Sequence, residues 1–397
     1  MPDISPVSPN NPPSALESFG HPPGQRKTFQ PTSILLIASL TVSLPGYSVP
    51  LPHATTAPGW KILPSLPDPV GFGGMFAGAC GQELLAGGGS QFREKPIWLG
   101  GTKTFSDRIF SLRPDASRWV ELPDRLPHPV ANFACAGSDD IIYLVGGLTP
   151  EGSISRCWRI RRRERKLEIG TLPDLPQRLT QACAAVVGGR LYVVGGLRQP
   201  TDVAALTEVW SLPVAAEDQT GSWRGEPRLP GPGVFVASAA SAGGRLYVLG
   251  GMEFDSPGKL VPSRAAYEFD LRDRNWRRLP DLPAPRVGPA SPSATLRSNR
   301  LLVIGGYAEV FPGAMRDHPG FPAETFVFDI GRQRWADGPM LPRPPIVDRD
   351  QPSDLGPCPT VLGASAVWNG LFVVVSGESR ASTRTPAVIG WPRALEP

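Results

Sequence analysis

A glutamate and an arginine, Glu378 and Arg384, lie six residues apart near the C-terminal end of the chain. A carboxylate can accept and return a proton, and a guanidinium can hold an anionic group through two parallel hydrogen bonds. If one short loop carries both side chains, they can converge on a small molecule. Exposed Glu–Arg pairs on loops are common, so a solvated pair of surface charges is the simpler interpretation of these two residues alone.

The segment before Glu378 is one copy of a repeated pattern, a short β-run that ends on two glycines. The clearest copies are residues 190–196, 246–251 and 301–306. Looser copies occupy 84–88 and 143–147, and the sixth, 372–377, has Ser376 in place of the first glycine. The copies recur at intervals of 49 to 71 residues. A period of about 50 residues with strands that end in Gly-Gly is typical of kelch-type blades in a β-propeller.

Four repeats continue with an aromatic strand and a second anchor nine residues later, and in the third repeat Trp210 and Trp223 are thirteen residues apart. The anchor pairs nine residues apart are Phe110/Trp119, Trp158/Leu167, Tyr267/Trp276 and Phe326/Trp335. A Leu-Pro phrase then closes the repeat, as in residues 172–176 and 279–283. Proline is tolerated there because a strand is ending and no ladder hydrogen bond is lost. The pattern predicts four strands in each blade.

The two ends of the predicted ring complement each other. Residues 60–67 have the tryptophan and the Leu-Pro phrase of a fourth strand, with no earlier strands before them. The last repeat, residues 363–391, has three predicted strands and no fourth. We therefore predict an all-β, six-bladed kelch-type β-propeller over residues 59–393, whose last blade is closed by an N-terminal strand at 60–63.

The long loops of the predicted blades emerge on one face, which is where we expect a ligand site. They cover residues 89–106, 148–156, 197–207, 252–265, 307–323 and 378–386, and residues 343–358 form an extended crossing on the same face. At the position after the paired glycines, the blades carry Gly89, Leu148, Leu197, Met252, Tyr307 and Glu378. Only the sixth blade has an acid there.

Residues 374–378 and 384–388 resemble the Asn-Gly-Glu-x5-Arg-Thr-Asp-Ala-Val stretch of the N-acetylneuraminate epimerase (sialic acid mutarotase) family. Residues 71–89 and 100–107 are similar to two further stretches of that family. The resemblance covers roughly residues 59 to 391, in an order that looks cyclically permuted. Pro386 stands in place of the family's aspartate, and Val130-Ala131-Asn132 stands where an epimerase-like arginine is expected.

The resemblance implies an isomerase that interconverts the α and β anomers of N-acetylneuraminate, or of a related sugar acid, by acid/base ring opening. Glu378 would be the acid/base, and Arg384 would grip the substrate carboxylate or stabilise a developing oxyanion. No metal or other cofactor is implied. Phe92 and Trp98 could stack on a sugar ring. Other polar residues on the long loops could contact the substrate, namely Lys103, Arg198, Glu253, Arg264, Glu309, Arg316 and His318.

Other functions remain compatible with a kelch ring. It could be a non-catalytic module that binds a glycan or a protein through its loop-rich face. A copper oxidase of the galactose oxidase type needs tyrosine and histidine ligands, and only His128 and His318 lie within the predicted propeller. A sialidase needs repeated Ser-x-Asp-x-Gly-x-Thr-Trp boxes, and the nearest match, residues 218–223, has its glycine displaced.

Charge and cysteine content point to no further partner. The net charge of +4 is too small to predict a nucleic-acid partner. A basic cluster at 159–166 is predicted to be a solvated outer hairpin, with an acidic surface or an anionic glycan as the alternative. Cys80, Cys135 and Cys183 fall on first strands, where we expect buried thiols.

Residues 1–58 are rich in proline and serine and are predicted to form a leader outside the propeller. Their apolar run at 34–44 is too short to span a bilayer and is typical of a signal peptide. We expect cleavage between about Ser48 and Thr56, which would leave no membrane anchor. The protein would then be periplasmic or secreted, and otherwise cytoplasmic.

Overall fold

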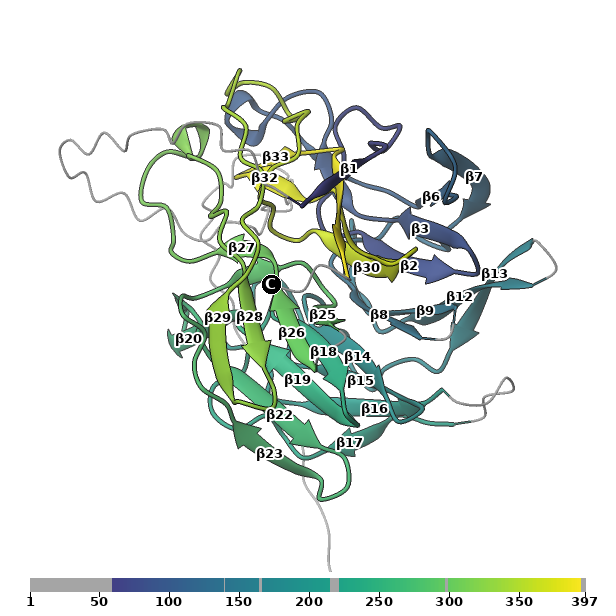
Figure 1. Ribbon diagram of the computed structural model, residues 1–397, viewed down its shortest axis with the longest axis vertical. Coiled ribbons are helices and arrows are strands. Elements are labelled where there is room, and N and C mark those ends of the chain that lie inside the picture. Colours follow the sequence, from purple (N-terminus) through teal and green to yellow (C-terminus); the bar gives the residue numbers. More distant parts are fainter. Residues whose placement is uncertain (1–58, 139, 164–165, 215–220, 297–298, 394–397) are drawn as a thin grey trace, which may run out of the picture. The chain divides into compact units, whose positions relative to one another are not determined.

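The computed structural model describes residues 59–138, 140–163, 166–214, 221–296 and 299–393. The predicted leader, with its apolar run at 34–44, lies outside the described residues. The described chain forms six four-stranded antiparallel sheets arranged as a β-propeller, which confirms the predicted fold (Figure 1). Its helices are two short 3-10 turns, η1 (Ile97–Leu99) and η2 (Met315–Asp317). Neither of these is long and apolar enough to cross a membrane.

The first three blades follow the predicted order of strand, turn, strand, paired glycines, loop and hairpin. Blade one consists of β2 (Phe76–Cys80), β3 (Glu83–Gly87), β6 (Arg108–Leu112) and β7 (Val120–Arg125). Blade two consists of β8 (Ala134–Ser138), β9 (Ile141–Val145), β12 (Cys157–Arg163) and β13 (Lys166–Leu172). Blade three consists of β14 (Cys183–Val187), β15 (Arg190–Val194), β16 (Val209–Pro213) and β17 (Arg224–Glu226).

Blades four and five repeat this order, and blade six is completed from the other end of the chain. Blade four has β18 (Ser238–Ala242), β19 (Arg245–Leu249), β22 (Ala266–Asp270) and β23 (Asn275–Arg278). Blade five has β25 (Ala294–Leu296), β26 (Arg300–Val303), β28 (Phe326–Asp329) and β29 (Arg334–Asp337). Blade six has β30 (Ala364–Trp368), β31 (Leu371–Val375), β34 (Val388–Pro392) and β1 (Lys61–Leu63).

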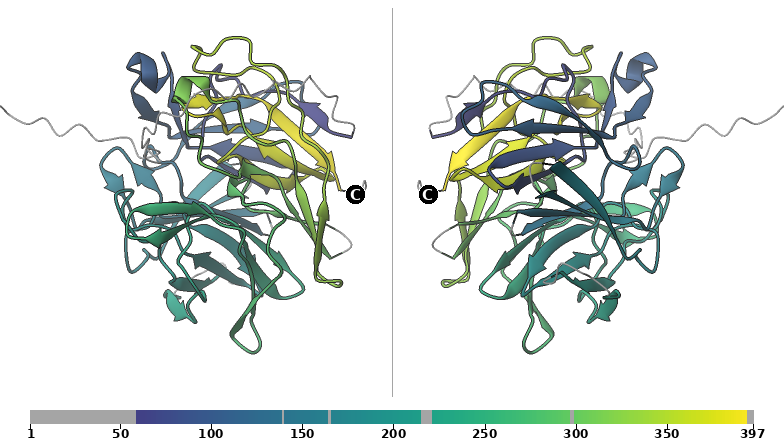
Figure 2. Two further views of the ribbon diagram at one scale, coloured as in Figure 1. Left: turned by 90° about the vertical axis from the view of Figure 1, so that its left-hand side faces the viewer. Right: turned by 90° about the vertical axis from the view of Figure 1, so that its right-hand side faces the viewer.

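Strand β1 closes the ring as the sequence predicts. It pairs antiparallel with β34, with Lys61 opposite Gly390 and Leu63 opposite Val388. In Figure 1 the purple β1 lies against the yellow C-terminal strands, and both views of Figure 2 show the purple and yellow blades as neighbours. The first strand of blade six also contacts that of blade one. The ends of the described chain are therefore joined by strand pairing and packing.

Short strand pairs project from the blades at their long loops. They are β4 (Ser90–Phe92) with β5 (Lys103–Phe105), β10 (Leu148–Thr149) with β11 (Gly152–Ser153), β20 (Met252–Ser256) with β21 (Lys259–Pro262), and β32 (Glu378–Arg380) with β33 (Thr383–Arg384). Blade five instead pairs β24 (Val287–Pro289) with β27 (Gly305–Tyr307). These pairs place the residues that follow the paired glycines on a rigid β-framework.

The tryptophans of the repeat link each blade to the one before it. The indole N–H of Trp276 donates to the Pro227 carbonyl of blade three at 2.8 Å, and Trp335 donates to the Pro280 carbonyl of blade four at 2.8 Å. The same contact recurs for Trp60 with Met340, for Trp119 with Pro64 and for Trp223 with Pro173. The carbonyl acceptors lie in or beside the Leu-Pro phrases. In each of these contacts the repeated tryptophan is therefore the donor, and a carbonyl in or beside the Leu-Pro phrase is the acceptor, of a hydrogen bond between two blades.

A closed cycle of backbone hydrogen bonds surrounds the centre of the ring. Each blade contributes one residue, and its N–H donates to the carbonyl of the equivalent residue in the preceding blade at 2.8–2.9 Å. All six have a positive φ, between 46° and 68°. They are Gly74, Asn132, Gln181, Val236, Gly288 and Leu362. Since a β-branched residue rarely adopts such a φ, the cycle holds Val236 in a strained conformation.

The core is divided among the interfaces between neighbouring blades. One cluster joins Phe72 and Phe110 of blade one with Val373 and Val375 of blade six. The predicted buried thiols are confirmed, since Cys80, Cys135 and Cys183 are free and buried. The basic cluster lies on the outer β12–β13 hairpin, where Arg161 pairs with Glu168 at 3.1 Å. The side chain of Arg161 is only 12% exposed, so the prediction of a solvated hairpin does not hold for this arginine.

Candidate functional site

Six equivalent backbone positions surround the channel on the face that carries the long loops. In each blade, the residue after the paired glycines pairs with the residue just before the member of the hydrogen-bond cycle. The six residues are Ser90, Leu148, Leu197, Met252, Tyr307 and Glu378. The sequence-based assignment of Gly89 to blade one is wrong by one residue, because blade one has three consecutive glycines and the left-handed pair is Gly88-Gly89.

The side chains at these positions divide the ring into two halves. Blades two, three and four present Leu148, Leu197 and Met252. Blades five, six and one, which are neighbours, present Tyr307, Glu378 and Ser90. The polar residues are thus gathered on one side of the channel. Because the glutamate and the tyrosine occupy the same position in adjacent blades, they act on each other electrostatically.

Glu378 and Arg384 form a buried ion pair. They lie directly opposite each other in the β32–β33 pair, and Arg384 Nη1 is 3.0 Å from Glu378 Oε1. Glu378 is 2% exposed and Arg384 is 3% exposed. The backbone N–H of Ser382 donates to the same carboxylate oxygen at 2.6 Å. The structure therefore brings the two residues together, and burial excludes the alternative of a solvated surface pair.

Arg384 also connects blade six to blade one. Its Nε donates to the Ser90 carbonyl at 3.2 Å, and its guanidinium lies 5.5 Å from the centre of the Phe92 ring. Together the two contacts restrict the orientation of the guanidinium, because the carbonyl accepts a hydrogen bond from Nε while the Phe92 ring attracts the positive charge. Arg384 is thus held by Glu378, by the backbone of blade one and by Phe92 at the same time.

Lys103 is the third charged group of this site. It lies on β5 directly opposite Phe92, and its ammonium is 5.5 Å from the centre of the Phe105 ring. Burial and the positive charge of Arg384 lower the pKa of Lys103 to about 8, and the negative charge of Glu378 partly offsets this. A lysine with this pKa is still largely charged at neutral pH and can lose its proton slightly above it.

Tyr307 contributes a buried hydroxyl to the same side of the channel. Among the described residues, this hydroxyl has no hydrogen-bond partner. Burial, and then the negative charge of Glu378, raise the pKa of Tyr307 well above its usual range. The phenol therefore stays protonated at neutral pH and remains available as a hydrogen-bond donor.

The crossing from blade five to blade six, residues 343–358, forms a strap over this site. Arg380, which is 1% exposed, donates from Nε to Asp354 Oδ2 at 3.0 Å and from Nη2 to Asp354 Oδ1 at 3.2 Å. The backbone N–H of Arg384 donates to the Pro352 carbonyl at 3.0 Å. The strap thus holds the side chain of Arg380, two residues after Glu378, and the backbone of Arg384.

The strap also reaches the loops of blades one and five. The Trp98 indole donates to Asp350 Oδ1 at 3.1 Å, and Arg316 donates to both carboxylate oxygens of Asp350 at 2.7 Å. Trp98 and Arg316, both considered as substrate contacts from the sequence, are thus engaged with the strap. Asp350 joins three loops that are far apart in the sequence.

Three of the other predicted substrate-binding residues contact their own blades instead. Arg198 Nε donates to Gln177 Oε1 at 2.9 Å, and Arg264 Nε donates to the Leu282 carbonyl at 2.6 Å. Glu253 accepts a hydrogen bond from the Ser263 hydroxyl. Glu309 is exposed beside a cavity formed with the blade-five loop. Lys103 is the predicted substrate-binding residue whose pKa depends on both Glu378 and Arg384.

Sequence reasoning missed the residues that support the pair. Arg380 belongs to the same loop as Glu378, and its near-complete burial depends on Asp354, which is 26 residues away. Tyr307 was noted as the blade-five equivalent of Glu378 but not as part of the site. The signal for Tyr307 was present in the sequence, as a polar aromatic residue at a position where three blades carry aliphatic side chains.

Comparisons with known proteins find one kelch motif, matching residues 237–283. A Haemophilus influenzae (strain PittEE) protein named N-acetylneuraminate epimerase is 28% identical over 149 residues, which are 37% of this chain and 37% of that protein. A protein of the same name from Pasteurella multocida (strain Pm70) is 25% identical over 232 residues, covering 55% of this chain and 58% of the relative.

A relative with a different name matches a longer stretch. Kelch-like protein terF of Aspergillus terreus (strain NIH 2624 / FGSC A1156) is 25% identical over 296 residues, covering 70% of this chain and 56% of that protein. In all three cases the match spans less than two thirds of the relative. The chain is therefore a six-bladed propeller with a kelch motif, similar in part to bacterial proteins named epimerases and in part to Kelch-like proteins.

Proposed function

We propose that this protein is a mutarotase that interconverts the α and β anomers of N-acetylneuraminate or a related sugar acid. The observation that carries the proposal is the buried contact of 3.0 Å between Arg384 Nη1 and Glu378 Oε1. It combines a proton acceptor with an anion-binding group in one site. The partial similarity to bacterial proteins named N-acetylneuraminate epimerase supports the same substrate class.

The proposed reaction is a ring opening followed by a ring closure. The Glu378 carboxylate takes the proton of the anomeric hydroxyl, the anomeric carbon becomes a ketone carbonyl, and its bond to the ring oxygen breaks. The ring oxygen then takes up the proton that Glu378 removed, and the hydroxyl of Tyr307, which stays protonated, donates a hydrogen bond to the opened sugar. Rotation about the bond to the former anomeric carbon and reversal of these steps then give the other anomer.

Arg384 and Lys103 serve the charged group of the substrate in this scheme. The substrate carboxylate is attached to the anomeric carbon, so an anion-binding group beside the proton acceptor fixes which bond is broken. Arg384 grips the carboxylate, and Lys103 adds a second positive charge. Each proton moves between a side chain and the sugar, so the protons balance over one cycle. The reaction requires no oxidant or reductant.

A second candidate is a non-catalytic propeller that binds a glycan or a protein through its loop-rich face. The observation that favours it is the similarity to Kelch-like protein terF over 70% of this chain. In that case Glu378 and Arg384 would be a structural pair that joins blades six and one. The two candidates differ in whether the anomer equilibrium is reached faster.

The test follows the α and β signals of freshly released α-N-acetylneuraminate by NMR, with and without the protein. We expect faster equilibration with the wild type and a loss of about 10²–10⁴-fold in Glu378→Gln, the range typical of a removed general base. Glu151→Gln is the matched control, because Glu151 is exposed on the blade-two loop. Its rate should equal that of the wild type.

Two results would contradict the proposal. Equal acceleration by Glu378→Gln and the wild type would remove the assigned acid/base role. No acceleration by the wild type, with sugar resonances still shifted on binding, would favour the non-catalytic propeller. Thermal melting of each variant checks that the ring is still folded.

A further inference from the structure

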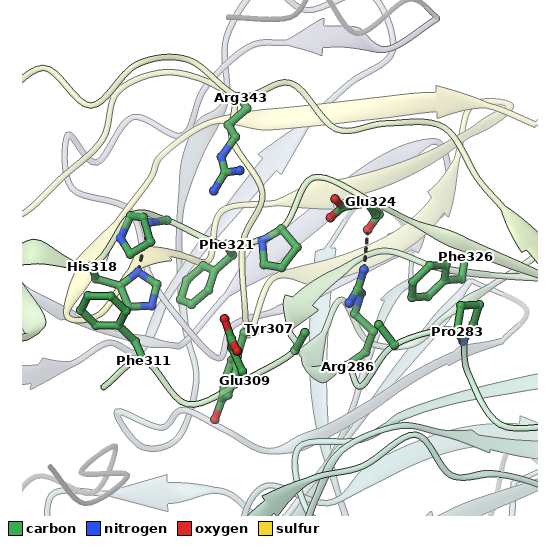
Figure 3. A pocket seen from close by; sticks show the side chains of 15 residues that line it. Pro283, Arg286, Tyr307, Glu309, Phe311, His318, Phe321, Glu324, Phe326 and Arg343 are labelled. Atoms are coloured by element: carbon green, nitrogen blue, oxygen red, sulfur yellow. Dashed lines mark hydrogen bonds between the residues drawn. The ribbon is translucent and has the colours of Figure 1, made fainter. Parts of the chain in front are cut away.

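A cavity of about 550 Å³ lies beside Tyr307, formed by the end of blade four and the long loop of blade five. Figure 3 shows Phe311, His318 and Phe321 on one side of it and Arg286 and Phe326 on the other, with Arg343 reaching in from the strap. The walls are therefore mainly aromatic, with two guanidinium groups among them. The proposed mutarotase reaction uses neither arginine.

Arg286 is a buried charge for which the described residues provide no ion pair. The residue is 2% exposed, and its Nη1 and Nη2 donate only to the backbone carbonyls of Pro285 at 2.9 Å and Glu324 at 3.2 Å. Among the described residues, its Nε has no hydrogen-bond partner. A guanidinium has five N–H donors, so donors remain for a ligand.

The aromatic wall compensates Arg286 only in part. Its guanidinium lies 4.3 Å from the centre of the Phe326 ring. Burial nevertheless lowers the pKa of Arg286, and the charge of Glu324 offsets this only partly. A buried charge without an ionic partner is strongly destabilising. An anion bound beside Arg286 would remove this penalty, which is a reason for the molecule to bind one.

The rest of the cavity is also suited to an anion. Burial and the positive charges of Arg380, Arg349 and Arg343 lower the pKa of His318 to about 4, so the imidazole is neutral at pH 7. Its Nδ1 accepts from the Gly320 N–H at 3.1 Å, which leaves the proton on Nε2. The imidazole is therefore a neutral N–H donor. The nearby arginines make the electrostatic potential around it positive.

The acidic residues of the cavity set an upper limit on the ligand charge. Glu309 and Glu324 are exposed at the cavity, and their carboxylates repel a multiply charged anion. The aromatic side chains favour a flat apolar body. We propose that this cavity, whose lining includes Tyr307 but neither Glu378 nor Arg384, is a second ligand site that binds a carboxylate with an aromatic ring and a single negative charge.

Arg286 and Arg343 hold the carboxylate of this ligand, and the aromatic side chains contact its ring. The inference does not depend on the mutarotase reaction, since it rests on the cavity and on the unpaired buried charge. It predicts selectivity for charge as well as for shape. A neutral ligand of the same shape would leave Arg286 without a counter-ion.

The experiment measures binding of phenylacetate to the full chain by ligand-observed NMR and calorimetry, with phenylacetamide as the neutral isostere. We expect phenylacetate to bind, and phenylacetamide to bind at least about tenfold more weakly, because charge-assisted hydrogen bonds are roughly twice as strong as neutral ones. Arg286→Gln and Arg343→Gln should each weaken phenylacetate binding. If Arg286→Gln does not fold, Arg343→Gln decides, because Arg343 is only half-buried.

Two further variants separate this site from the proposed catalytic one. Arg384→Gln should bind phenylacetate as the wild type does, and so should Arg332→Gln, which changes an exposed arginine on the outer hairpin of blade five. Equal binding of the amide and the acid, no binding of either, or binding lost only in Arg384→Gln would overturn the inference. The last result would place the anion at the Glu378–Arg384 pair, which leaves the proposed function standing.

Discussion

The surroundings of Lys103 disfavour the charged form of its side chain. Its ammonium lies beside Phe105 and near Arg384, and its pKa falls from 10.5 to about 8. The folded state therefore binds this proton less tightly than the unfolded chain does. Between these two pKa values the stability of the fold rises with pH as far as this group is concerned, because the unfolded state holds more protons.

Lys103→Met should therefore stabilise the fold at pH 7. We expect the free energy of unfolding to rise by about 2–3 kcal/mol, since one pKa unit corresponds to about 1.4 kcal/mol and Lys103 is not fully buried. The gain should shrink as the pH rises from 8 to 10.5, because the wild type then sheds the unfavourable proton. Urea unfolding at pH 7, 9 and 10.5 measures it.

The control for Lys103→Met is Lys166→Met on the exposed outer hairpin of blade two. Its effect should be small and should not depend on pH in this range. A loss of stability in Lys103→Met would show that the ammonium is a net stabilising contact. Under the proposed function, Lys103→Met should also weaken substrate binding, so that stability and activity change in opposite directions.

At the scale of elements, the strap is held by side-chain contacts and by backbone hydrogen bonds to the loop of blade six. The bidentate Arg380–Asp354 pair is the strongest of them, because Arg380 is 1% exposed. The strap has no pairing in a blade sheet, so its position depends on these side chains and on single backbone bonds such as that from Arg384 to Pro352. Substitutions in the strap should therefore change the position of Arg384.

Asp354→Ala should destabilise the protein by about 3–5 kcal/mol, because the buried guanidinium of Arg380 loses its carboxylate and keeps the backbone carbonyls of Arg349 and Asp348 as acceptors. Asp354→Asn keeps an acceptor and should cost less. Thermal melting and urea unfolding of both variants test this order. If alanine and asparagine cost the same and less than about 1 kcal/mol, the pair does not hold the strap.

The sequence predicts those parts of the blades that depend on local patterns. The Gly-Gly strand ends, the aromatic hairpins and the Leu-Pro phrases repeat, and the structure uses them in each blade for pairing and for the tryptophan bonds. The error at Gly89 has a local cause as well. Three successive glycines fit two alignments, and the structure selects the one that places Ser90 after the pair.

The candidate site could be predicted only where one residue differs from its equivalents. Glu378 stands out as the acid among six equivalent positions, and Arg384 follows in the same loop. Arg286 gives no such signal, since its burial depends on Phe326 and on the Glu324 carbonyl, about 40 residues along the chain. Contacts of this kind arise from the packing of blade on blade, which a single sequence does not encode in any repeated pattern.

At the scale of the whole molecule, β1 joins the two ends of the propeller. Three residues, Lys61 to Leu63, pair with β34, and Trp60 donates to the Met340 carbonyl of blade five. Without them, β34 would become an open sheet edge and blade six would lose the Trp60 hydrogen bond to blade five. The last blade should therefore be the first to open in a shortened chain.

A chain that begins at Gly59 should melt at nearly the same temperature as the full chain. A chain that begins at Pro64 should melt at a clearly lower temperature, because β1 and Trp60 are gone. Differential scanning calorimetry of the two truncated chains gives the comparison. Identical melting temperatures would show that β1 does not close the ring. Export through the leader at 1–58 stays a separate prediction, tested by following cleavage near Ser48–Thr56.

The cycle of six backbone hydrogen bonds also narrows the centre of the ring. Only about 50 Å³ of free space is left among the side chains and backbone at this level, enough for a few water molecules. A separate cavity of about 460 Å³ lies among the first strands, lined by Ala77, Ala136 and Ala240. Under the proposed function, a sugar that enters from the loop-bearing face would therefore leave by the same face. One molecule would have to leave before the next could enter, so slow release of the product would delay binding of the next substrate.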